Sequence, residues 1–247
     1  MTELVKYSAA DGRATLTFDS QHNRNALSRQ LVSEFYAGLE AAEADETVKV
    51  VVIRAEGRTF CSGADLSEAS TTPMEQGAMA IVELQRRIVA LSKPVVTRLH
   101  GNVRAGGIGI VAASDIAVSA DDATYALTEV RLALTPAAIS LTVLPRMTSR
   151  AAALTALTGD KFTGAEAAAM GLVTLAVPEA ELDAAVDRVC ASLIAGAPQG
   201  LRETKALLAR PLLERIDTLG PDLAALSARL FNSDEAREAM VAFLSKK

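Results

Sequence analysis

The sequence predicts an α/β fold with a helical region at its carboxyl-terminal end, and three observations support this. Short β-prone runs recur before helical stretches, and from Pro136 onward the pattern becomes mostly helical. Half of the 247 residues are hydrophobic, which is enough apolar surface for one core. Strands mixed with helices, followed by a helical tail, are typical of an α/β core with an appendage. We place the core at residues 1–190 and the helical region at residues 191–247.

The first elements are two short strands and a helix. The β-prone runs are Leu4–Ala9 and Ala14–Phe18, and Asp11-Gly12 between them is a turn signal. Ser28 carries a side-chain oxygen that can cap a helix, which we expect to run to about Ala44. Apolar residues at helical spacing support this helix, namely Leu31, Phe35, Leu39 and Ala42.

Two continuous apolar runs, Lys49–Ala55 and Lys93–Leu99, predict strands that are buried on both faces. Between them we expect a helix over roughly Met74–Leu91. After the second run, two more short strands are predicted at Asp115–Ser119 and Ala123–Leu127. The later predictions are helix ends at Thr158-Gly159 and Met170-Gly171, a last strand at Leu172–Val177, and three helices over residues 179–247.

Composition argues against several classes of protein. The net charge is −5 and the basic residues are scattered, which disfavours nucleic-acid binding. Cys61 and Cys190 lie far apart, so we expect no disulfide framework and a reducing cytoplasm. No apolar run approaches the roughly 20 residues that span a bilayer. Neither His22 nor His100 has metal-ligand spacing to other residues. We therefore expect a cytoplasmic protein with no membrane partner and no metal.

A glycine-bearing loop, Phe60-Cys61-Ser62-Gly63-Ala64-Asp65-Leu66, follows the first buried strand. Gly63 allows backbone angles that other residues resist, and this can turn successive N–H groups toward one point. An ordinary strand-to-helix turn explains the same residues. For this loop alone, both interpretations stay open.

A second glycine-rich segment, from Gly101 to Gly109, follows the second buried strand and opens an apolar helix. Unpaired N–H groups at a helix start attract negative charge, so an oxyanion could bind there. The run GIGIVA at 107–112, with Glu129 further on, also fits a dinucleotide-binding pattern. That pattern begins about eight residues after its strand and opens a short helix in mid-chain, which argues against it.

Four ordered motifs resemble the crotonase (enoyl-CoA hydratase/isomerase) family over nearly the whole chain. They are FCSGADL at 60–66, HGNVRAGGIGIVAASDIAVSA at 100–120, ATYALTEVRLALTP at 123–136 and LTGDKFTGAEAAAMGLV at 157–173. The terminal AFLSKK is also similar to that family. The resemblance implies a spiral of ββα units, a helical trimer-forming region, and a homotrimer or a dimer of trimers.

The same resemblance implies an acyl-CoA thioester substrate, with coenzyme A entering as part of the substrate and no separate cofactor. The thioester oxygen would bind two backbone N–H groups, which by position are those of Ala64 and Gly106. Residues near Arg24 and Ala26 would border the nucleotide, although an exposed loop arginine explains Arg24 equally well. The implied substrate-binding residues are Arg24, Ala26, Ser62, Gly63, Asp65, Leu66, Gly107, Gly109 and Arg131.

Hydratases of this family typically use two glutamates. By position, the first falls at Gly109, where this chain departs from the pattern, and the second falls at Glu129. Glu129 is therefore the candidate acid/base, and its apolar neighbours Leu127 and Val130 favour a carboxylate that exchanges protons near neutral pH. A surface or ion-paired glutamate is the alternative.

One carboxylate beside an enolate-stabilising site permits hydration or double-bond isomerisation. The block EVRLALTPAAIS at 129–140 resembles methylglutaconyl-CoA-type hydratases, so the sequence favours an enoyl-CoA hydratase. A Δ3,Δ2-enoyl-CoA isomerase and a non-catalytic acyl-CoA-binding homologue are the alternatives, because a fold does not determine a function.

Three further segments carry weaker hypotheses. Arg131 or Arg104 could bind a distal carboxylate of the acyl group, and a structural ion pair is the alternative for each. Cys61 has no partnered histidine, and we interpret it as a small buried hydrophobic residue. Residues 71–76 could close over the acyl chain or form a plain surface loop.

Overall fold

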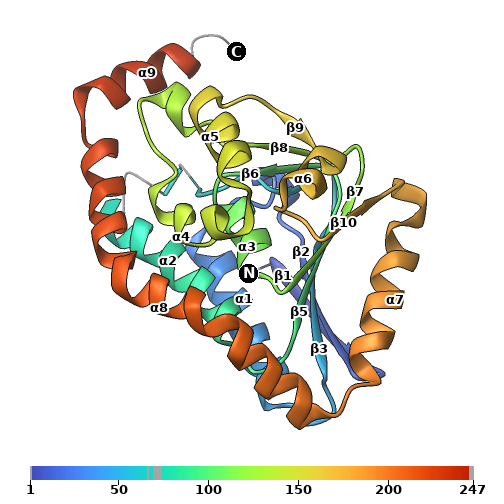
Figure 1. Cartoon of the computed structure of the whole chain (residues 1–247). Coiled ribbons are helices and arrows are strands. Elements are labelled where there is room, and N and C mark those ends of the chain that lie inside the picture. The colour runs from blue at the N-terminus through green and yellow to red at the C-terminus, as the bar shows by residue number, and fades with distance from the viewer. Residues whose placement is uncertain (1, 66, 69–73, 245–247) are drawn as a thin grey trace.

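The structure is a computed structural model that describes residues 2–65, 67–68 and 74–244. It has a six-stranded sheet in the order β1-β2-β3-β5-β7-β10 and a four-stranded sheet in the order β4-β6-β8-β9 (Figure 1). Helices α1 and α2 lie on one side of the larger sheet and α7 on the other (Figure 1). The predicted α/β class with a helical carboxyl-terminal region is confirmed.

The chain starts with the predicted hairpin. Strands β1 (Val5–Ala10) and β2 (Arg13–Phe18) are antiparallel, with Ala10 opposite Arg13. The two turn residues, Asp11 and Gly12, have φ values of 51° and 80°. Two consecutive left-handed residues are what a tight two-residue hairpin turn requires, and the Asp-Gly pair tolerates them.

Three successive ββα units build the spiral, and each gives one strand to each sheet. β3 (Val50–Ala55) and β4 (Thr59–Cys61) precede α2 (Met74–Ala90), and β5 (Val95–Leu99) and β6 (Asn102–Arg104) precede α3 (Gly106–Ala113). β7 (Ile116–Ala120) and β8 (Thr124–Ala126) precede the 3-10 turn η2 (Glu129–Leu132) and α4 (Ala137–Arg146). Pairing within each sheet is parallel along this series, so all three units advance in the same direction.

Helix α1 (Arg29–Ala44) forms as predicted. Ser28 is its N-cap, and the Ser28 side chain accepts a hydrogen bond from the Leu31 N–H at 3.3 Å. The helix buries the predicted apolar stripe. At the other end, Lys93 Nζ donates to the carbonyls of Ala42 and Asp45, each at 2.6 Å, which places a positive charge at the negative end of the helix dipole.

The elements after α4 are α5 (Ser149–Thr158), β9 (Phe162–Thr163), α6 (Gly164–Met170) and β10 (Leu175–Val177). Gly159 and Gly171 end α5 and α6 in left-handed conformations, which confirms the two predicted helix ends. The small 3-10 turns η1 (Gln21–Asn23) and η3 (Glu179–Glu181) complete the minor elements.

Helix α7 (Leu182–Ile194) packs against β5 and β7, and the predicted boundary at residue 190 lies inside it. The groove between α7 and the sheet, about 260 Å3, is crossed by two ion pairs, Arg13–Asp187 and Arg98–Asp183. The buried Cys190 belongs to the same core as the sheet. The division into 1–190 and 191–247 stays a prediction.

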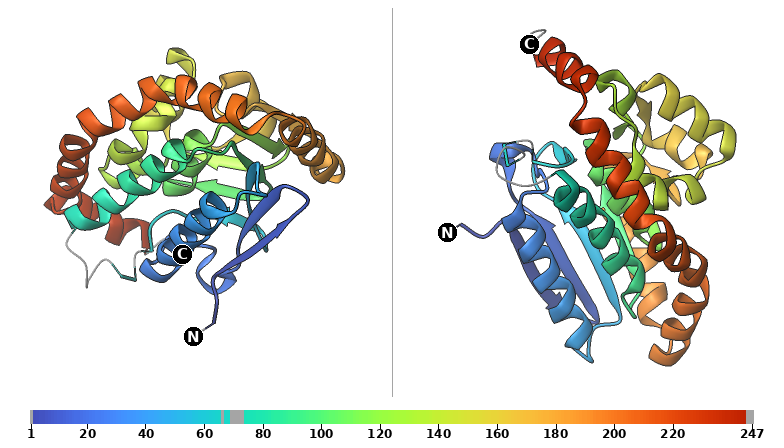
Figure 2. Two further views of the ribbon diagram at one scale, coloured as in Figure 1. Left: turned by 90° about the horizontal axis from the view of Figure 1, so that it is seen from below. Right: turned by 90° about the vertical axis from the view of Figure 1, so that its left-hand side faces the viewer.

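Helix α8 (Pro198–Phe231) lies along α2 and α4, and α9 (Asp234–Leu244) follows it (Figure 2). A Cβ on Gly220 would lie 2.9 Å from Val82 Cγ1, so α8 approaches α2 closely there. The Lys205 side chain is buried, pairs with Asp115 at 2.9 Å and donates to the Ile88 and Lys93 carbonyls. This contact joins α8 to the end of α2 and the starts of β5 and β7.

Three short strands, β4, β6 and β9, were not predicted. Each has two or three residues and lies in a segment whose glycines and polar residues indicate a loop. Their pairing depends on neighbouring strands that are distant in sequence, so local patterns cannot reveal them.

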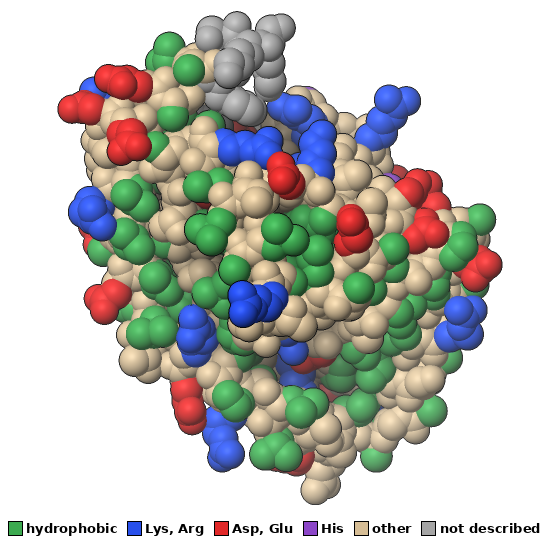
Figure 3. Space-filling model, turned by 45° about the horizontal axis from the view of Figure 1, so that its top comes forward, with side chains coloured by type: hydrophobic (Ala, Val, Ile, Leu, Met, Phe, Trp, Pro, Cys, Tyr) green, Lys and Arg blue, Asp and Glu red, His purple; other side chains and the backbone are tan. Residues whose placement is uncertain are grey.

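Within the described residues, no helix combines the length and apolar character needed to cross a bilayer. Over that same part of the chain, His, Cys, Asp and Glu side chains form no cluster with metal-binding arrangement. Cys61 and Cys190 are both buried and unpaired. On the face shown in Figure 3, basic and acidic side chains are mixed among apolar ones, and several basic side chains lie near its upper edge.

Candidate active site

Three strands of the small sheet end at one common edge, and a predicted site residue follows each of them. β4, β6 and β8 are parallel neighbours, with Cys61 opposite Val103 and Arg104 opposite Ala126. Ala64 follows β4, Gly106 follows β6 and Glu129 follows β8, each two or three residues beyond the strand end. Ligands of parallel sheets bind outside the carboxyl ends of the strands, and this edge is such a place.

The loop after β4 is held by a backbone hydrogen bond to the segment that contains Leu27. Gly63 has a φ of 98°, and its carbonyl accepts a hydrogen bond from the Leu27 N–H at 2.8 Å. A trans peptide unit directs its C=O and N–H in opposite directions. The Leu27 contact therefore aims the Ala64 N–H away from the loop that contains Leu27.

A polar network joins this loop to residues 20–25. The Ser62 hydroxyl donates to the Asn23 carbonyl at 3.2 Å, and the Asn23 amide donates to Asp65 Oδ2 at 2.9 Å. Asp65 Oδ1 accepts from the Ser67 N–H and hydroxyl. These contacts to Asn23 and Ser67 keep the pKa of the Asp65 carboxyl low, against the opposing effect of partial burial. The Asp65 carboxylate thus shapes the loop.

Asn25 was not identified from the sequence, yet it anchors the residues that surround Ala26. Its side chain is fully buried, donates to the Glu56 and Thr59 carbonyls and accepts from the Ser20 N–H. Its φ is 54°, in the left-handed region that asparagine tolerates better than most residues. A single sequence does not reveal that angle.

The N-terminus of α3 meets the first loop directly. A Cβ placed on Gly63 would lie 2.8 Å from Ala105 Cβ and 3.6 Å from the Gly106 nitrogen. Ala105 itself has φ 44° and ψ −118°, an unusual conformation for a residue with a side chain. Such strain persists where the surroundings impose it, and it often accompanies function. The two backbones therefore come into contact at this place.

The N–H groups of Ala64 and Gly106 have no hydrogen-bond partner within the part of the chain that the structure describes. Ala64 is exposed, whereas Gly106 is buried. A Cβ on Gly106 would lie 2.7 Å from Leu27 Cδ1 and 3.5 Å from Ile81 Cδ1. Two free donors beside apolar side chains can bind a carbonyl oxygen that gains negative charge.

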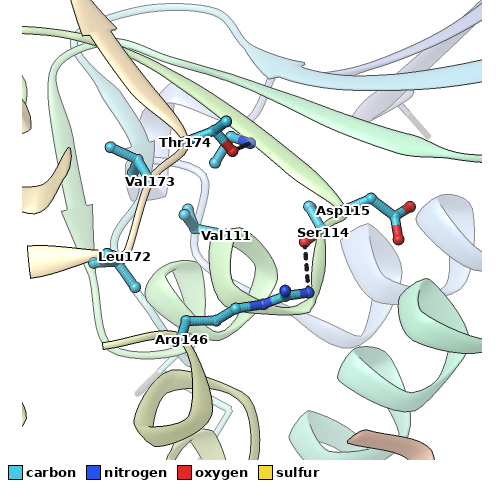
Figure 4. Close-up of a pocket in the computed structure, with 9 residues that line it drawn as sticks. Val111, Ser114, Asp115, Arg146, Leu172, Val173 and Thr174 are labelled. Atoms are coloured by element: carbon cyan, nitrogen blue, oxygen red, sulfur yellow. Dashed lines mark hydrogen bonds between the residues drawn. The ribbon is translucent and has the colours of Figure 1, made fainter. Parts of the chain in front are cut away.

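At the C-terminal end of α3, a positive side chain complements the helix dipole. The Arg146 guanidinium donates to the Ala112 carbonyl at 3.0 Å. It also donates to the Ser114 carbonyl at 3.2 Å, the dashed line in Figure 4. A small cavity of about 80 Å3 lies around this side chain, between the end of α3 and residues 171–174. A cation at this end matches the helix dipole, while at the other end the Gly106 N–H has no partner among the described residues.

Glu129 begins η2, and its carboxylate is largely withdrawn from water. Oε2 is buried and has no hydrogen-bond partner among the described residues. Burial raises the pKa of Glu129 to about 7, and a hydrogen bond from its own backbone N–H acts in the opposite direction. Of its two apolar sequence neighbours, Leu127 is buried, whereas Val130 is 40% exposed. Because only one of the two neighbours is buried, the desolvation of the Glu129 carboxylate depends mainly on tertiary packing.

Gly109 is buried in the middle of α3. A Cβ there would lie 2.9 Å from Ile139 Cγ2 and 3.3 Å from Gln85 Cδ. The fully buried Gln85 amide donates to the Ala138 and Ile81 carbonyls and accepts from the Thr142 hydroxyl at 2.6 Å. Side chains of α2 and α4 thus occupy the space in front of Gly109.

Arg131 and Arg104 both bind protein groups. The Arg131 guanidinium pairs with Asp160 and donates to the Thr158 carbonyl at the end of α5. The half-buried Arg104 guanidinium donates to the backbone of β6 and to the Thr124 carbonyl and hydroxyl in β8. A substrate-binding role for either arginine stays a prediction.

The remaining predicted residues divide by location. Arg24 is exposed in a left-handed conformation (φ 60°), whereas Ala26 is buried next to the Leu27–Ala64 bridge. Gly107 lies in the first turn of α3. Leu66 and residues 71–73 lie outside the described residues, and Met74–Gln76 form the start of α2.

The spiral of ββα units, with free N–H groups at the strand edge, defines a crotonase-type protein. Residues 9–247 match the sequence profile of the enoyl-CoA hydratase/isomerase family, and the chain belongs to that family. An enoyl-CoA hydratase structure from Mycobacterium avium is similar with a TM-score of 0.93 and 46% identity, over 100% of this chain and 98% of that one.

Two curated relatives differ in the activity that their names state. "Probable enoyl-CoA hydratase" of Bacillus subtilis is 30% identical over 90% of this chain and 89% of its own length. The peroxisomal Delta(3,5)-Delta(2,4)-dienoyl-CoA isomerase of Arabidopsis thaliana is 28% identical over 99% of this chain and 94% of its own. The family therefore includes both hydratases and isomerases at similar identity to this chain.

Proposed function

We propose that this protein adds water to a 2-enoyl-CoA thioester, with Glu129 as its single acid/base residue. The proposal rests on one observation, the buried Glu129 carboxylate at the same strand edge as two free N–H groups. A carboxyl group with a pKa near the working pH can both accept and return a proton. The sequence block at 129–140 and the hydratase names among the relatives support the choice of hydration.

The reaction balances with one carboxylate. The oxygen of water bonds to C3 of the enoyl group while Glu129 accepts a proton from that water. The electron pair of the C2=C3 bond moves toward the thioester, whose oxygen becomes an enolate. Glu129 then returns the proton to C2 as the carbonyl re-forms, and the net result is addition of one water molecule.

The Ala64 and Gly106 N–H groups would bind the thioester oxygen as its charge develops. One such preorganised donor typically contributes on the order of 3 kcal/mol to a transition state. Only contacts that strengthen as charge develops accelerate the step. The apolar contacts of Leu27 and Ile81 with Gly106 reduce competition from water at this point. Coenzyme A takes part only as the thioester carrier of the substrate.

Double-bond isomerisation is the second candidate, and the packing around Gly109 favours it. Ile139 and Gln85 leave no room for a side chain at the position of the missing glutamate. Moving a proton between C2 and C4 requires one base and no bound water. In that reaction Glu129 would remove a proton from one carbon and return it to the other.

The test is a panel of 2-enoyl-CoA and 3-enoyl-CoA thioesters, with products identified by mass, run on the wild type, Glu129→Gln and Glu46→Gln. The control residue Glu46 is an exposed glutamate in the turn after α1. We expect a product heavier by one water, and a rate loss of at least about 100-fold in Glu129→Gln only. A product of unchanged mass with a shifted double bond would select isomerisation. Binding without turnover in the wild type would contradict both reactions and identify an acyl-CoA-binding protein.

We also propose that the chain assembles as a trimer or a dimer of trimers. Exposed leucines on α5 and α8 support an interface between copies, namely Leu154, Leu157, Leu207 and Leu208. Light scattering coupled to size-exclusion chromatography tests this, and a monomeric mass at micromolar concentration would contradict it.

A further inference from the structure

Cys61, the last residue of β4, contacts both halves of the candidate site. Its Sγ accepts a hydrogen bond from the Gly63 N–H at 3.4 Å. On its other side, a Cβ placed on Gly107 would lie 2.8 Å from Cys61 Cβ and 3.3 Å from Sγ. The side chain therefore lies between the loop that contains Ala64 and the first turn of α3, which begins at Gly106.

The chemical state of Cys61 excludes a role as a nucleophile. The side chain is fully buried, and burial raises the pKa of its thiol to about 12. At neutral pH it is a thiol, and the thiolate is the reactive form of cysteine. A neutral thiol can still act as a small packing group and a weak hydrogen-bond acceptor.

Two contacts hold the backbone on either side of Gly63, just before the Ala64 N–H, and Cys61 makes one of them. The Gly63 carbonyl is held by the Leu27 N–H, and the Gly63 N–H is held by the Cys61 sulfur. Together they restrain the backbone on both sides of Gly63 Cα, which has φ 98° and is intrinsically free to rotate. Without the sulfur, the Ser62–Gly63 peptide unit would lose this restraint, and the Leu27 contact and the polar contacts of Asn23 would be left to hold the loop.

The volume of the Cys61 side chain limits how closely the Gly106 N–H, the second donor, can approach β4. Gly107 packs against Cys61 with no space for a methyl group. The sulfur is thus a spacer between β4 and α3, and α3 carries the Gly106 N–H. Donors to an oxyanion act over a narrow range of 2.7–3.1 Å, so a change in this spacer alters how both donors reach one oxygen.

We propose that Cys61 is a positioning residue that sets the spacing and direction of the Ala64 and Gly106 N–H groups. This inference rests on the proposed function, in which both groups bind the thioester oxygen. It predicts that substitution of Cys61 reduces the polarisation of that oxygen much more than it weakens the binding of coenzyme A.

The experiment compares Cys61→Ala and Cys61→Ser with Cys190→Ala. Cys190 is a matched control, because it is the second buried free cysteine and lies in α7, outside the small sheet. Two readouts are measured, the kinetic constants and the infrared C=O stretch of a bound, carbonyl-labelled butyryl-CoA. The stretch moves to lower frequency when donors polarise the carbonyl. A general loss of protein stability does not by itself change the C=O frequency of the bound ligand.

We expect Cys61→Ala to lower kcat about 10- to 100-fold, because a donor displaced by about 1 Å loses much of its effect. KM should change less than about three-fold, and the C=O shift should shrink. Cys61→Ser keeps an acceptor for the Gly63 N–H and should recover part of both losses. Cys190→Ala should match the wild type in both readouts.

The outcomes separate this inference from the proposed function. No C=O shift in the wild type would contradict the oxygen site itself and, with it, the inference. A wild-type shift that persists in Cys61→Ala, with kcat unchanged, would overturn the role of Cys61 alone. If Cys61→Ala does not fold by circular dichroism, Cys61→Ser carries the test, and wild-type values for both its kcat and its shift would overturn the inference.

Discussion

Gly109 and Ile139 are packed so closely that a Cβ on the glycine would lie 2.9 Å from Cγ2 of the isoleucine. Gln85 closes the same space from α2, where Thr142 and two backbone carbonyls hold its amide. Glycine at this position is therefore part of the packing of three helices. Replacing it with a glutamate would require α2 or α4 to move.

Gly109→Ala should lower the free energy of unfolding, although alanine is the better helix former. Overpacking a core costs about 1–3 kcal/mol, whereas the change from glycine to alanine in a helix contributes about 1 kcal/mol. In an Ile139→Ala background the approach of 2.9 Å is removed and only that of Gln85 Cδ at 3.3 Å is left, so the same substitution should cost less stability. Urea denaturation of the four proteins measures this. Equal effects of Gly109→Ala in both backgrounds would show that Ile139 does not restrict this position.

The pH dependence of activity should follow Glu129. Its carboxylate accepts the proton of water in the proposed mechanism, so the deprotonated form of the free enzyme is active. Because burial raises the pKa of Glu129 to about 7, kcat/KM should rise up to about pH 7 and then level off. Initial rates between pH 5 and 9 test this. A profile already level at pH 5 would place the ionisation elsewhere.

The same carboxyl group should make stability depend on pH. The folded pKa of about 7 exceeds the ordinary value of 4.5, so between these values the folded state holds a proton that the unfolded chain has lost. The free energy of unfolding should therefore fall by about 3 kcal/mol as pH rises through this window, and stay lower above it. The Glu129→Gln variant lacks this ionisation, so the difference between the stability curves of the wild type and the variant gives the contribution of Glu129. Parallel stability curves for the two proteins from pH 4.5 to 8 would contradict this prediction.

Lys205→Met should destabilise the protein strongly. Lys205 is buried and holds Asp115 as well as the Ile88 and Lys93 carbonyls. Removing one partner of a buried pair typically costs about 3–5 kcal/mol. Asp115→Asn should recover part of this loss, because it removes the unpaired charge. The exposed Lys161→Met is the control, and thermal unfolding with a denaturant series gives the values. A loss no larger than that of the control would show that the pair contributes little.

Arg131→Ala and Arg104→Ala test the hypothesis of a distal carboxylate. Both guanidinium groups are engaged by the protein, Arg131 by Asp160 and Thr158, and Arg104 by β6 and β8. We expect the ratio of kcat/KM for carboxylated and plain enoyl-CoA thioesters to stay the same in both variants. The exposed Arg131–Asp160 pair should contribute less than about 1 kcal/mol to stability. A tenfold fall in that ratio for one variant would assign substrate recognition to its arginine.

Local features of the sequence predicted the elements that local physics determines. Asp11-Gly12 predicted the hairpin turn because both residues tolerate positive φ. Ser28 and the apolar stripe of α1 predicted that helix, and the glycines after Thr158 and Met170 predicted two helix ends. The four ordered motifs implied the crotonase family, and the match over residues 9–247 confirms it.

Long-range packing decided the remainder. The strands β4 and β6 depend on pairing with neighbours distant in sequence. With β8, which the sequence predicted, they share a common edge that brings Ala64, Gly106 and Glu129 to one side of the sheet. The sequence by itself determined which residue types are available, including the glycine at position 109. The tertiary structure decided that Gly109 is enclosed by Ile139 and Gln85, and that Glu129 is desolvated although Val130 beside it is exposed. The physical reason is that burial and close packing depend on atoms that are distant in sequence, which no local pattern contains.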